Sequence, residues 1–250
     1  MTNNHQWRKA IVFLLFFFIL LVIFGLILKQ QTNKFLDTGV GASSDISEVD
    51  LYIADKHFVI PKNYIWSKTD WGGGIRTGVN LHTVLPNMEG YSKDNKKAFM
   101  PGSNDMISFQ VRAKGLPKLN PPVNMTMKQF YTDSVIYNGN VIKEVELKNG
   151  LIRQFISDAR LVKDSEINKP YDLHKDYEIY RGKDEEHFYW VRCDPDASVL
   201  YPSCQTILFY SSHILVRYTF SKKNLSKWKV IEKKIIRLIS AFDTSNRQGN

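Results

Sequence analysis

The sequence predicts an α+β protein: an N-terminal transmembrane helix precedes one domain, whose antiparallel β-sheet is packed by a C-terminal amphipathic helix. Three patterns lead to this fold class. Residues 10–28 are apolar and uncharged, the middle of the chain holds many short β-rich runs, and residues 225–242 repeat apolar side chains every three or four positions. Alternation with period two is typical of strands, and a three-to-four spacing is typical of helices.

The apolar run at residues 10–28 is long enough to cross a bilayer, because a helix of this length covers roughly 28 Å. It exceeds the apolar region of a cleaved signal peptide and lacks small residues at a cleavage site, which favours an uncleaved anchor. Arg8 and Lys9 precede it, so we expect a cytoplasmic N-terminus in the inner membrane. The predicted organisation is a cytoplasmic tail (1–9), an anchor (10–28), a tether (29–48), a periplasmic α+β domain (49–243) and a disordered tail (244–250).

Short runs rich in β-branched and aromatic residues predict the strands of the sheet. The first hairpin is expected from 49–53 and 57–61, and Asn149-Gly150 between two later runs is typical of a type I′ turn. Residues 125–133 are expected to form a short helix. The other predicted strands are 75–85, 106–112, 141–147, 151–156, 176–180, 186–192, 206–210 and 214–220. Consecutive strands joined by tight turns favour an antiparallel sheet.

The last predicted element is a helix with Asn224 as its N-cap. Its apolar stripe consists of Leu225, Trp228, Ile231, Ile235, Leu238, Ile239 and Phe242. Lysine and arginine occupy much of the other side, so the helix suits either the cover of a sheet or a membrane surface. We favour packing on the sheet, because aromatic residues on a regular stripe are typical of a core.

Cys193 and Cys204 are the two cysteines of the chain. In an oxidising compartment an even number of cysteines favours a disulfide, and closing this loop would stabilise the domain by roughly 2–3 kcal/mol. A metal or nucleophile site is the alternative, but metal-binding cysteines are usually closer together and have further ligands nearby. We therefore expect a disulfide.

No pattern in the sequence predicts a catalytic residue, a cofactor or a metal. The histidines lack metal-ligand spacing, and no nucleophile elbow or phosphate-binding loop is present. The formal net charge of +9 is compatible with an acidic protein partner, with anionic lipid, or with lysines scattered over a solvated surface. Export of the domain disfavours nucleic acid as the partner.

Three segments resemble a group of small bacterial envelope proteins encoded beside type VI secretion effectors. The segments are 58–65, 79–91, and a C-terminal block that runs from Cys193–Cys204 through 225–228 to 239–242. These relatives are thought to be immunity proteins. The resemblance implies a membrane-anchored periplasmic protein that neutralises a toxin by binding it, and it carries over no functional residue.

We interpret the chain as a binding protein for a secreted toxin and not as an enzyme. Trp66, Trp71 and Arg76 around the glycine loop are the candidate partner-binding residues, because aromatic and arginine anchors dominate the binding energy of many interfaces. Their alternative role is structural, as core aromatics and a solvated arginine. The alternative function is a cell-envelope enzyme or a structural subunit of an envelope complex.

Overall fold

A computed structural model of the chain describes residues 17–18, 20–24, 41–115, 121–136, 140–157, 162–163, 170–171, 177–184 and 187–245. The chain divides into two compact units, residues 1–41 and 42–250. The strands that the structure describes all belong to the second unit, and the first of them begins at Glu48.

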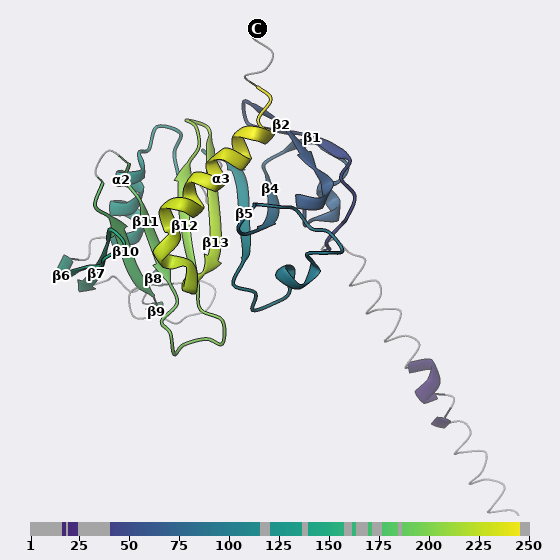
Figure 1. Ribbon diagram of the computed structural model, residues 1–250, viewed down its shortest axis with the longest axis horizontal. Helices are drawn as coiled ribbons and strands as arrows, with labels where there is room; N and C mark the ends of the chain where they lie inside the picture. Colours follow the sequence, from purple (N-terminus) through teal and green to yellow (C-terminus); the bar gives the residue numbers. More distant parts are fainter. Residues whose placement is uncertain are drawn as a thin grey trace, which may run out of the picture. The chain divides into compact units, whose positions relative to one another are not determined.

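One eight-stranded antiparallel sheet dominates the second unit, with the strand order β4-β5-β13-β12-β11-β10-β7-β6 (Figure 1). Its strands are β4 (Gly78–Val84), β5 (Met106–Ala113), β6 (Asn140–Glu146), β7 (Leu151–Ser157), β10 (Glu178–Gly182), β11 (Trp190–Cys193), β12 (Ser203–Phe209) and β13 (Ile214–Ser221). The hairpins β6–β7, β10–β11 and β12–β13 join neighbours in sequence, as predicted. The pairing of β5 with β13 is different, because it joins segments about a hundred residues apart.

A smaller three-stranded sheet contains β1 (Glu48–Ile53), β2 (Lys56–Pro61) and β3 (Gly74–Arg76). The predicted first hairpin is confirmed as β1–β2, whereas β3 pairs with β1 in parallel. The predicted single strand 75–85 is therefore divided between two sheets. Gly78 marks the division: a Cβ there would lie 2.8 Å from the Val111 carbonyl oxygen, so only glycine lets β4 start this close to β5. A further short pair joins β8 (Val162–Lys163) and β9 (Pro170–Tyr171).

The C-terminal helix α3 (Trp228–Phe242) lies across one face of the large sheet (Figure 1). Its buried residues are Trp228, Ile231, Ile235, Ile239 and Phe242, as the apolar stripe predicted. They belong to the same core cluster as Val216, Tyr218 and Phe220 of β13, so the helix packs on the sheet and not on a membrane surface. The predicted N-cap is wrong, because Asn224 lies in the preceding 3-10 helix η5 (Lys222–Lys227) and donates to the Asn104 carbonyl at 2.6 Å.

The other helix, α2 (Met127–Tyr131), begins with a capping box between Thr126 and Gln129 and continues into the π-helical segment η4 (Thr132–Ile136). Apolar residues of α2 and η4 form a second core cluster with Trp190, Ile207 and Leu215, on the sheet face opposite α3. The turn between β6 and β7 also differs from the prediction. Leu147 and Leu151 are hydrogen-bonded to each other and close a turn of three residues, 148–150. Of these three, only Gly150 has a positive φ, whereas a type I′ turn has two central residues that both have a positive φ.

The predicted α+β fold with an N-terminal transmembrane helix is wrong. In the second unit the described α-helices have five and fifteen residues, and the short runs joined by turns make the fold mainly β. Of the predicted anchor at 10–28, residues 17–18 and 20–24 are described as helix, and the others lie outside the described residues. No helix among the described residues is long and apolar enough to cross a membrane. The predicted inner-membrane location, with a periplasmic domain, is withdrawn on this finding.

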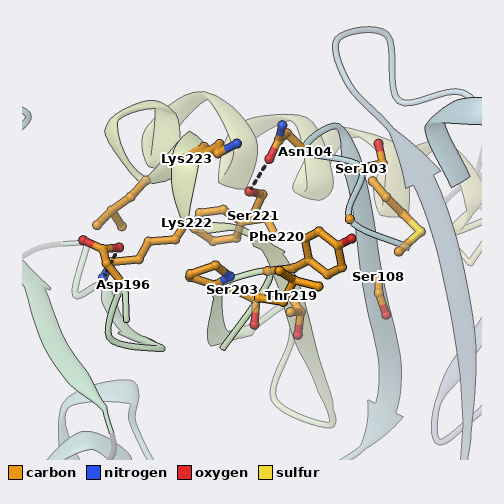
Figure 2. Close-up of a pocket in the computed structure, with 16 residues that line it drawn as sticks. Ser103, Asn104, Ser108, Asp196, Ser203, Thr219, Phe220, Ser221, Lys222 and Lys223 are labelled. Atoms are coloured by element: carbon orange, nitrogen blue, oxygen red, sulfur yellow. Dashed lines mark hydrogen bonds and ion pairs between the residues drawn. The ribbon is translucent and has the colours of Figure 1, made fainter. Parts of the chain in front are cut away.

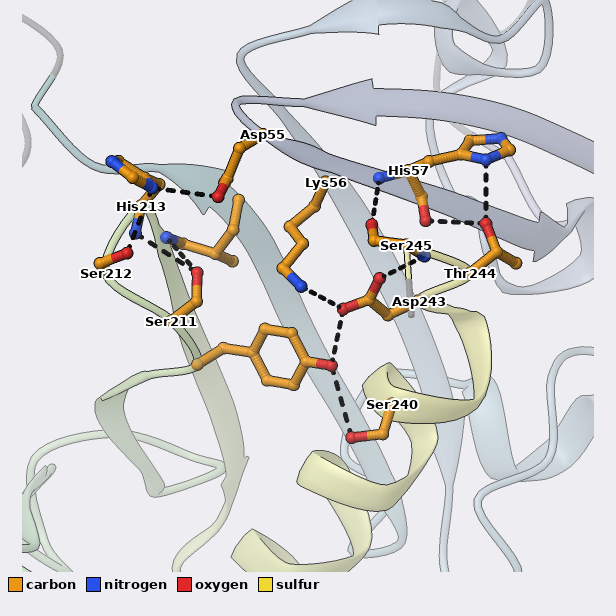
Figure 3. Close-up of polar contacts among 12 residues, drawn as sticks. Asp55, Lys56, His57, Ser211, Ser212, His213, Ser240, Asp243, Thr244 and Ser245 are labelled. Carbon is orange, nitrogen blue, oxygen red and sulfur yellow. Dashed lines mark hydrogen bonds and ion pairs between the residues drawn. The ribbon is translucent and has the colours of Figure 1, made fainter. Parts of the chain in front are cut away.

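A polar cluster joins the end of α3 to the small sheet and to the β12–β13 turn (Figure 3). The buried Asp243 carboxylate forms an ion pair with Lys56 at 3.1 Å and accepts from the Tyr210 hydroxyl at 3.0 Å and the Ser245 amide at 3.0 Å. These hydrogen bonds hold the pKa of Asp243 below its usual value, although burial alone would raise it. Thr244 and Ser245, which the sequence assigned to a disordered tail, are hydrogen-bonded to His57 of β2.

We expect Ile235→Ala to lower the free energy of unfolding by about 2–5 kcal/mol, because Ile235 is fully buried between α3 and the sheet. Lys233→Ala on the exposed side of the same helix should change it by less than about 0.5 kcal/mol. Urea denaturation of both variants measures the difference. Equal losses would contradict the docking of α3.

Glu232 is an acidic residue at the interface of α3 with the sheet. Burial raises the pKa of its carboxyl to about 7, and nearby His187 and Tyr218 offset only part of this effect. Because the folded pKa lies above the unfolded one, this carboxyl destabilises the fold as the pH rises from about 4.5 to 7. His82 has the opposite effect: burial lowers its pKa to about 4, so stability falls as the pH drops from about 6.5 to 4.

The free energy of unfolding of the native protein, relative to Glu232→Gln, should therefore fall by up to about 3 kcal/mol between pH 4.5 and pH 8. The comparison with Gln cancels the contributions of His82 and of all other titrating groups. Urea denaturation across this pH range measures the difference, and a pH-independent difference would show that Glu232 ionises normally in the folded protein.

Candidate functional site

The disulfide between Cys193 and Cys204 closes a loop, residues 194–202, that we call the cysteine loop. The two cysteines are opposite each other on β11 and β12, and the structure confirms the predicted bond. Next to the disulfide, Asp194 and Ser203 close the base of the loop: the Asp194 carboxylate accepts from the Ser203 amide at 2.8 Å and from its hydroxyl at 2.9 Å. The loop is thus anchored covalently and by hydrogen bonds at the end of the sheet.

Lys222 holds the cysteine loop from the other side. Its ammonium group forms ion pairs with Glu178 at 2.6 Å and Asp196 at 2.9 Å and donates to the Asp194 carbonyl at 2.9 Å. Burial alone would lower the pKa of Lys222, but the hydrogen bonds to the two carboxylates raise it above the usual value. Lys222 therefore stays charged and fixes the loop to β10 and η5.

The tip of the cysteine loop is apolar and exposed. Val199, Leu200 and Tyr201 expose 46%, 82% and 58% of their surface. The Tyr201 ring lies against Gly102, where a Cβ atom would come within 2.6 Å of the ring. Exposed apolar residues side by side on an anchored loop are typical of contact surfaces.

A groove of about 690 Å³ lies between this loop and the β13–η5 connection (Figure 2). Asp196, Ser203, Thr219, Lys222 and Lys223 line it together with Ser103, Asn104, Ser108, Phe220 and Ser221. The Ser221 hydroxyl donates to Asn104 at 3.0 Å across the groove. We call this cavity the end groove.

Three arginines, the arginine cluster, lie on the sheet face opposite α3: Arg112 on β5, Arg217 on β13 and Arg192 on β11. Their neighbours Val111, Val191 and Val216 all belong to the core cluster under α3, and side chains alternate along a strand, so the arginines point the other way. Arg112 is opposite Leu215, and Arg192 is opposite Gln205 of β12. From β5 to β11 there are three strand spacings, roughly 14 Å, and the register places Arg192 level with Thr219, four residues beyond Leu215 on β13. The cluster therefore runs diagonally across the face over roughly 19 Å, with Arg217 between the other two arginines.

Polar side chains surround the arginine cluster on the same face. Gln110 donates to Asn80 at 2.8 Å, Gln205 donates to Thr219 at 3.4 Å, and Arg192 donates to Gln205. Arg192 also lies over the Tyr177 ring, 5.0 Å from its centroid. This half of the face is polar and partly exposed, whereas α2 and η4 cover the other half with apolar side chains.

Within the part of the chain that the structure describes, the arginine cluster has no carboxylate paired with it. Among the described residues no carboxylate forms an ion pair with Arg112, Arg192 or Arg217, and the buried Nε of Arg217 has no hydrogen-bond partner. Burial, and then repulsion by Arg112 and Arg192, lower the pKa of Arg217. An arrangement of this kind attracts carboxylates, because a guanidinium group binds a carboxylate through two parallel hydrogen bonds.

The residues that the sequence suggested for partner binding lie elsewhere and have structural contacts. Trp66 stacks on His82, with ring centroids 4.3 Å apart. Trp71 donates to the Ile65 carbonyl at 3.1 Å and packs against the main core. Arg76 forms an ion pair with Asp70 at 3.3 Å. A binding role for these three residues stays a prediction.

Sequence reasoning missed the arginine cluster because its members come from three strands. The one signal available is a repeated Val-Arg pair, at 111–112, 191–192 and 216–217. In each pair an apolar residue is followed by a charged one within a strand-like run, which indicates an arginine on the solvated face. The sheet order that brings the three pairs together is not visible in any local pattern.

Two further arrangements bear on chemistry. Thr244, His57 and Asp50 form a hydroxyl–imidazole–carboxylate series, with contacts of 2.9 and 2.8 Å; Figure 3 shows the contact between Thr244 and His57. However, both the amide and the hydroxyl of Thr244 also contact the His57 carbonyl, at 2.9 and 3.1 Å, so this series joins the chain after α3 to β2. Among the described residues there is no group of three or more His, Cys, Asp or Glu that could hold a metal.

The fold and the site define a class of protein: an antiparallel sheet covered on one face by a C-terminal helix, with a basic polar surface on the other face. No known protein-family model matches the sequence, and no curated protein matches it.

Two solved structures are similar to this chain. Smlt3025, an immunity protein of the Stenotrophomonas maltophilia type IV secretion system, aligns with 79% of this chain and 94% of its own, at 13% identity and a TM-score of 0.52. The iron-regulated outer membrane lipoprotein FrpD of Neisseria meningitidis aligns with 81% of this chain and 96% of its own, at 11% identity and a TM-score of 0.44. At these identities the first likeness shows a shared fold, and nothing is inferred from the second.

We expect Lys222→Ala to release the cysteine loop, because Glu178 and Asp196 would lose the cation that joins them. The free energy of unfolding should fall by about 1–3 kcal/mol, and cleavage between residues 196 and 202 by a nonspecific protease should become faster. Lys223→Ala, at the exposed neighbouring position, is the matched control. Equal cleavage rates for the two variants would show that Lys222 does not restrain the loop.

Proposed function

We propose that this protein is an immunity protein, which neutralises a secreted protein toxin by binding it stoichiometrically and without turnover. The fold shared with Smlt3025, over most of both chains, is the observation that carries the proposal. The resemblance of segments 58–65, 79–91 and 193–242 to immunity-like proteins supports it independently of the fold.

The site supports binding more than catalysis. Its most unusual features are a surplus of arginines and an exposed apolar loop tip, which are both features of protein interfaces. Positive charge at the surface would also speed the encounter with an acidic toxin. The sequence resemblance favours a type VI effector as that toxin, whereas Smlt3025 belongs to a type IV system. We propose a secreted protein toxin encoded beside the gene, with a type VI effector as the particular case.

The test is a titration of the activity of that purified toxin with this protein. A binding protein should abolish the activity linearly, with an end point at one molar equivalent, and coexpression should protect cells that produce the toxin. Full inactivation by a small fraction of an equivalent would instead indicate an enzyme that modifies the toxin. Undiminished toxin activity at a large excess would contradict the immunity function.

A further inference from the structure

The arginine cluster and the cysteine-loop tip belong to one continuous surface. Ser203 and Thr219 line the end groove, which Leu200 and Tyr201 border. The same two residues line a smaller hollow beside Arg192 and Gln205. The polar half of the sheet face therefore runs without interruption into the apolar tip of the loop.

In the free protein the charges and hydrogen bonds of this surface are energetically unfavourable. Arg112 and Arg192 both repel Arg217, which lies between them, and the buried Nε of Arg217 lacks the hydrogen bond that a buried donor needs. Two other partly buried cations do have carboxylate partners: Lys222 has Glu178 and Asp196, and Arg153 has Glu178 at 2.9 Å. Carboxylates from outside would remove the repulsion and complete the missing hydrogen bond.

We propose that this surface is the docking site for an acidic protein, which presents carboxylates to Arg112, Arg192 and Arg217 and an apolar pocket to Val199, Leu200 and Tyr201. The inference rests on the proposed function and names the contact surface and the chemistry of the toxin. The loop tip favours a protein over a nucleic acid, because a phosphate backbone satisfies arginines but offers no pocket to an exposed leucine. The disulfide and Lys222 keep the loop in place before binding, which reduces the entropy lost on association.

The first experiment measures binding of fluorescent poly-L-glutamate to the full chain by anisotropy. We expect binding that weakens as salt rises, and an affinity at least tenfold lower for the double variant Arg192→Glu, Arg217→Glu. The matched control is Lys233→Glu, Arg237→Glu, which reverses two exposed charges on the outer side of α3 and should change affinity by less than twofold. Equal weakening in both double variants would mean that diffuse charge binds the polymer, and would overturn the proposal.

Because Arg217 lies in a central strand, its replacement by Glu is checked with Arg217→Met, which keeps the apolar stem and removes the charge. Met should retain the thermal stability of the native protein and still weaken polyglutamate binding severalfold. If a stable Met variant binds as tightly as the native protein, Arg217 is not a contact and the proposal fails. Tighter binding of single-stranded RNA or of phosphatidylglycerol vesicles than of polyglutamate, at equal charge concentration, would overturn the assignment to a protein.

The second experiment repeats the measurement with the toxin encoded beside the gene and adds Leu200→Ser. Affinity for the toxin should fall at least tenfold, because Leu200 is proposed to enter its apolar pocket. Affinity for polyglutamate should fall less than twofold, because an uncharged leucine makes no ionic contact with the polymer. A toxin that binds the native protein and every variant equally would refute the docking surface and leave the immunity function intact. A toxin that does not bind, while polyglutamate still depends on the arginine cluster, would refute the immunity function and leave the acidic-protein site intact.

Discussion

The packing of α3 on one face of the eight-stranded sheet is the interaction on which the rest of this structure depends. It buries five side chains of the helix against alternate residues of the central strands, and so decides which side chains of these strands are core. Because alternation is strict, residues on the opposite face of the same strands must be polar or need a second cover. The chain uses both solutions: α2 and η4 cover one half, and the arginine cluster occupies the other.

Much of this fold could be predicted from local pattern. Alternation identified nearly all strands of the main sheet, and helical spacing identified the buried stripe of α3. The errors lie where a contact between residues far apart in the sequence determines where a strand or helix begins or ends. The run 75–85 reads as one strand, but Gly78 approaches β5 while β3 joins the small sheet beside β1. Asn224 suits an N-cap, yet its amide is needed by the Asn104 carbonyl, so the α-helix begins four residues later.

The candidate site was less accessible to sequence reasoning than the fold. Trp66, Trp71 and Arg76 were chosen because aromatic and arginine side chains anchor interfaces, but the same properties make them useful partners inside this domain, for His82, Ile65 and Asp70. Conversely, each arginine of the cluster looks ordinary within its own strand. Only the pairing of β5 with β13, across about a hundred residues, places Arg112 beside Arg217. Local sequence contains no information about that pairing, since it depends on which strands share the face under α3.

The position of the cysteine loop follows from the same constraint. Cys193 and Cys204 face α3 and are fully buried, so the loop between them must leave the sheet at its end, next to the last residues of β13. There Lys222, directly after β13, can reach both Glu178 in β10 and Asp196 in the loop. A buried disulfide on one side of the sheet thus presents an apolar tip beside a basic surface on the other side. Neither feature would give selectivity alone: arginines attract any anion, and an exposed leucine attracts any apolar surface. Together they require a partner with carboxylates and a pocket at a set separation, which is a far rarer combination.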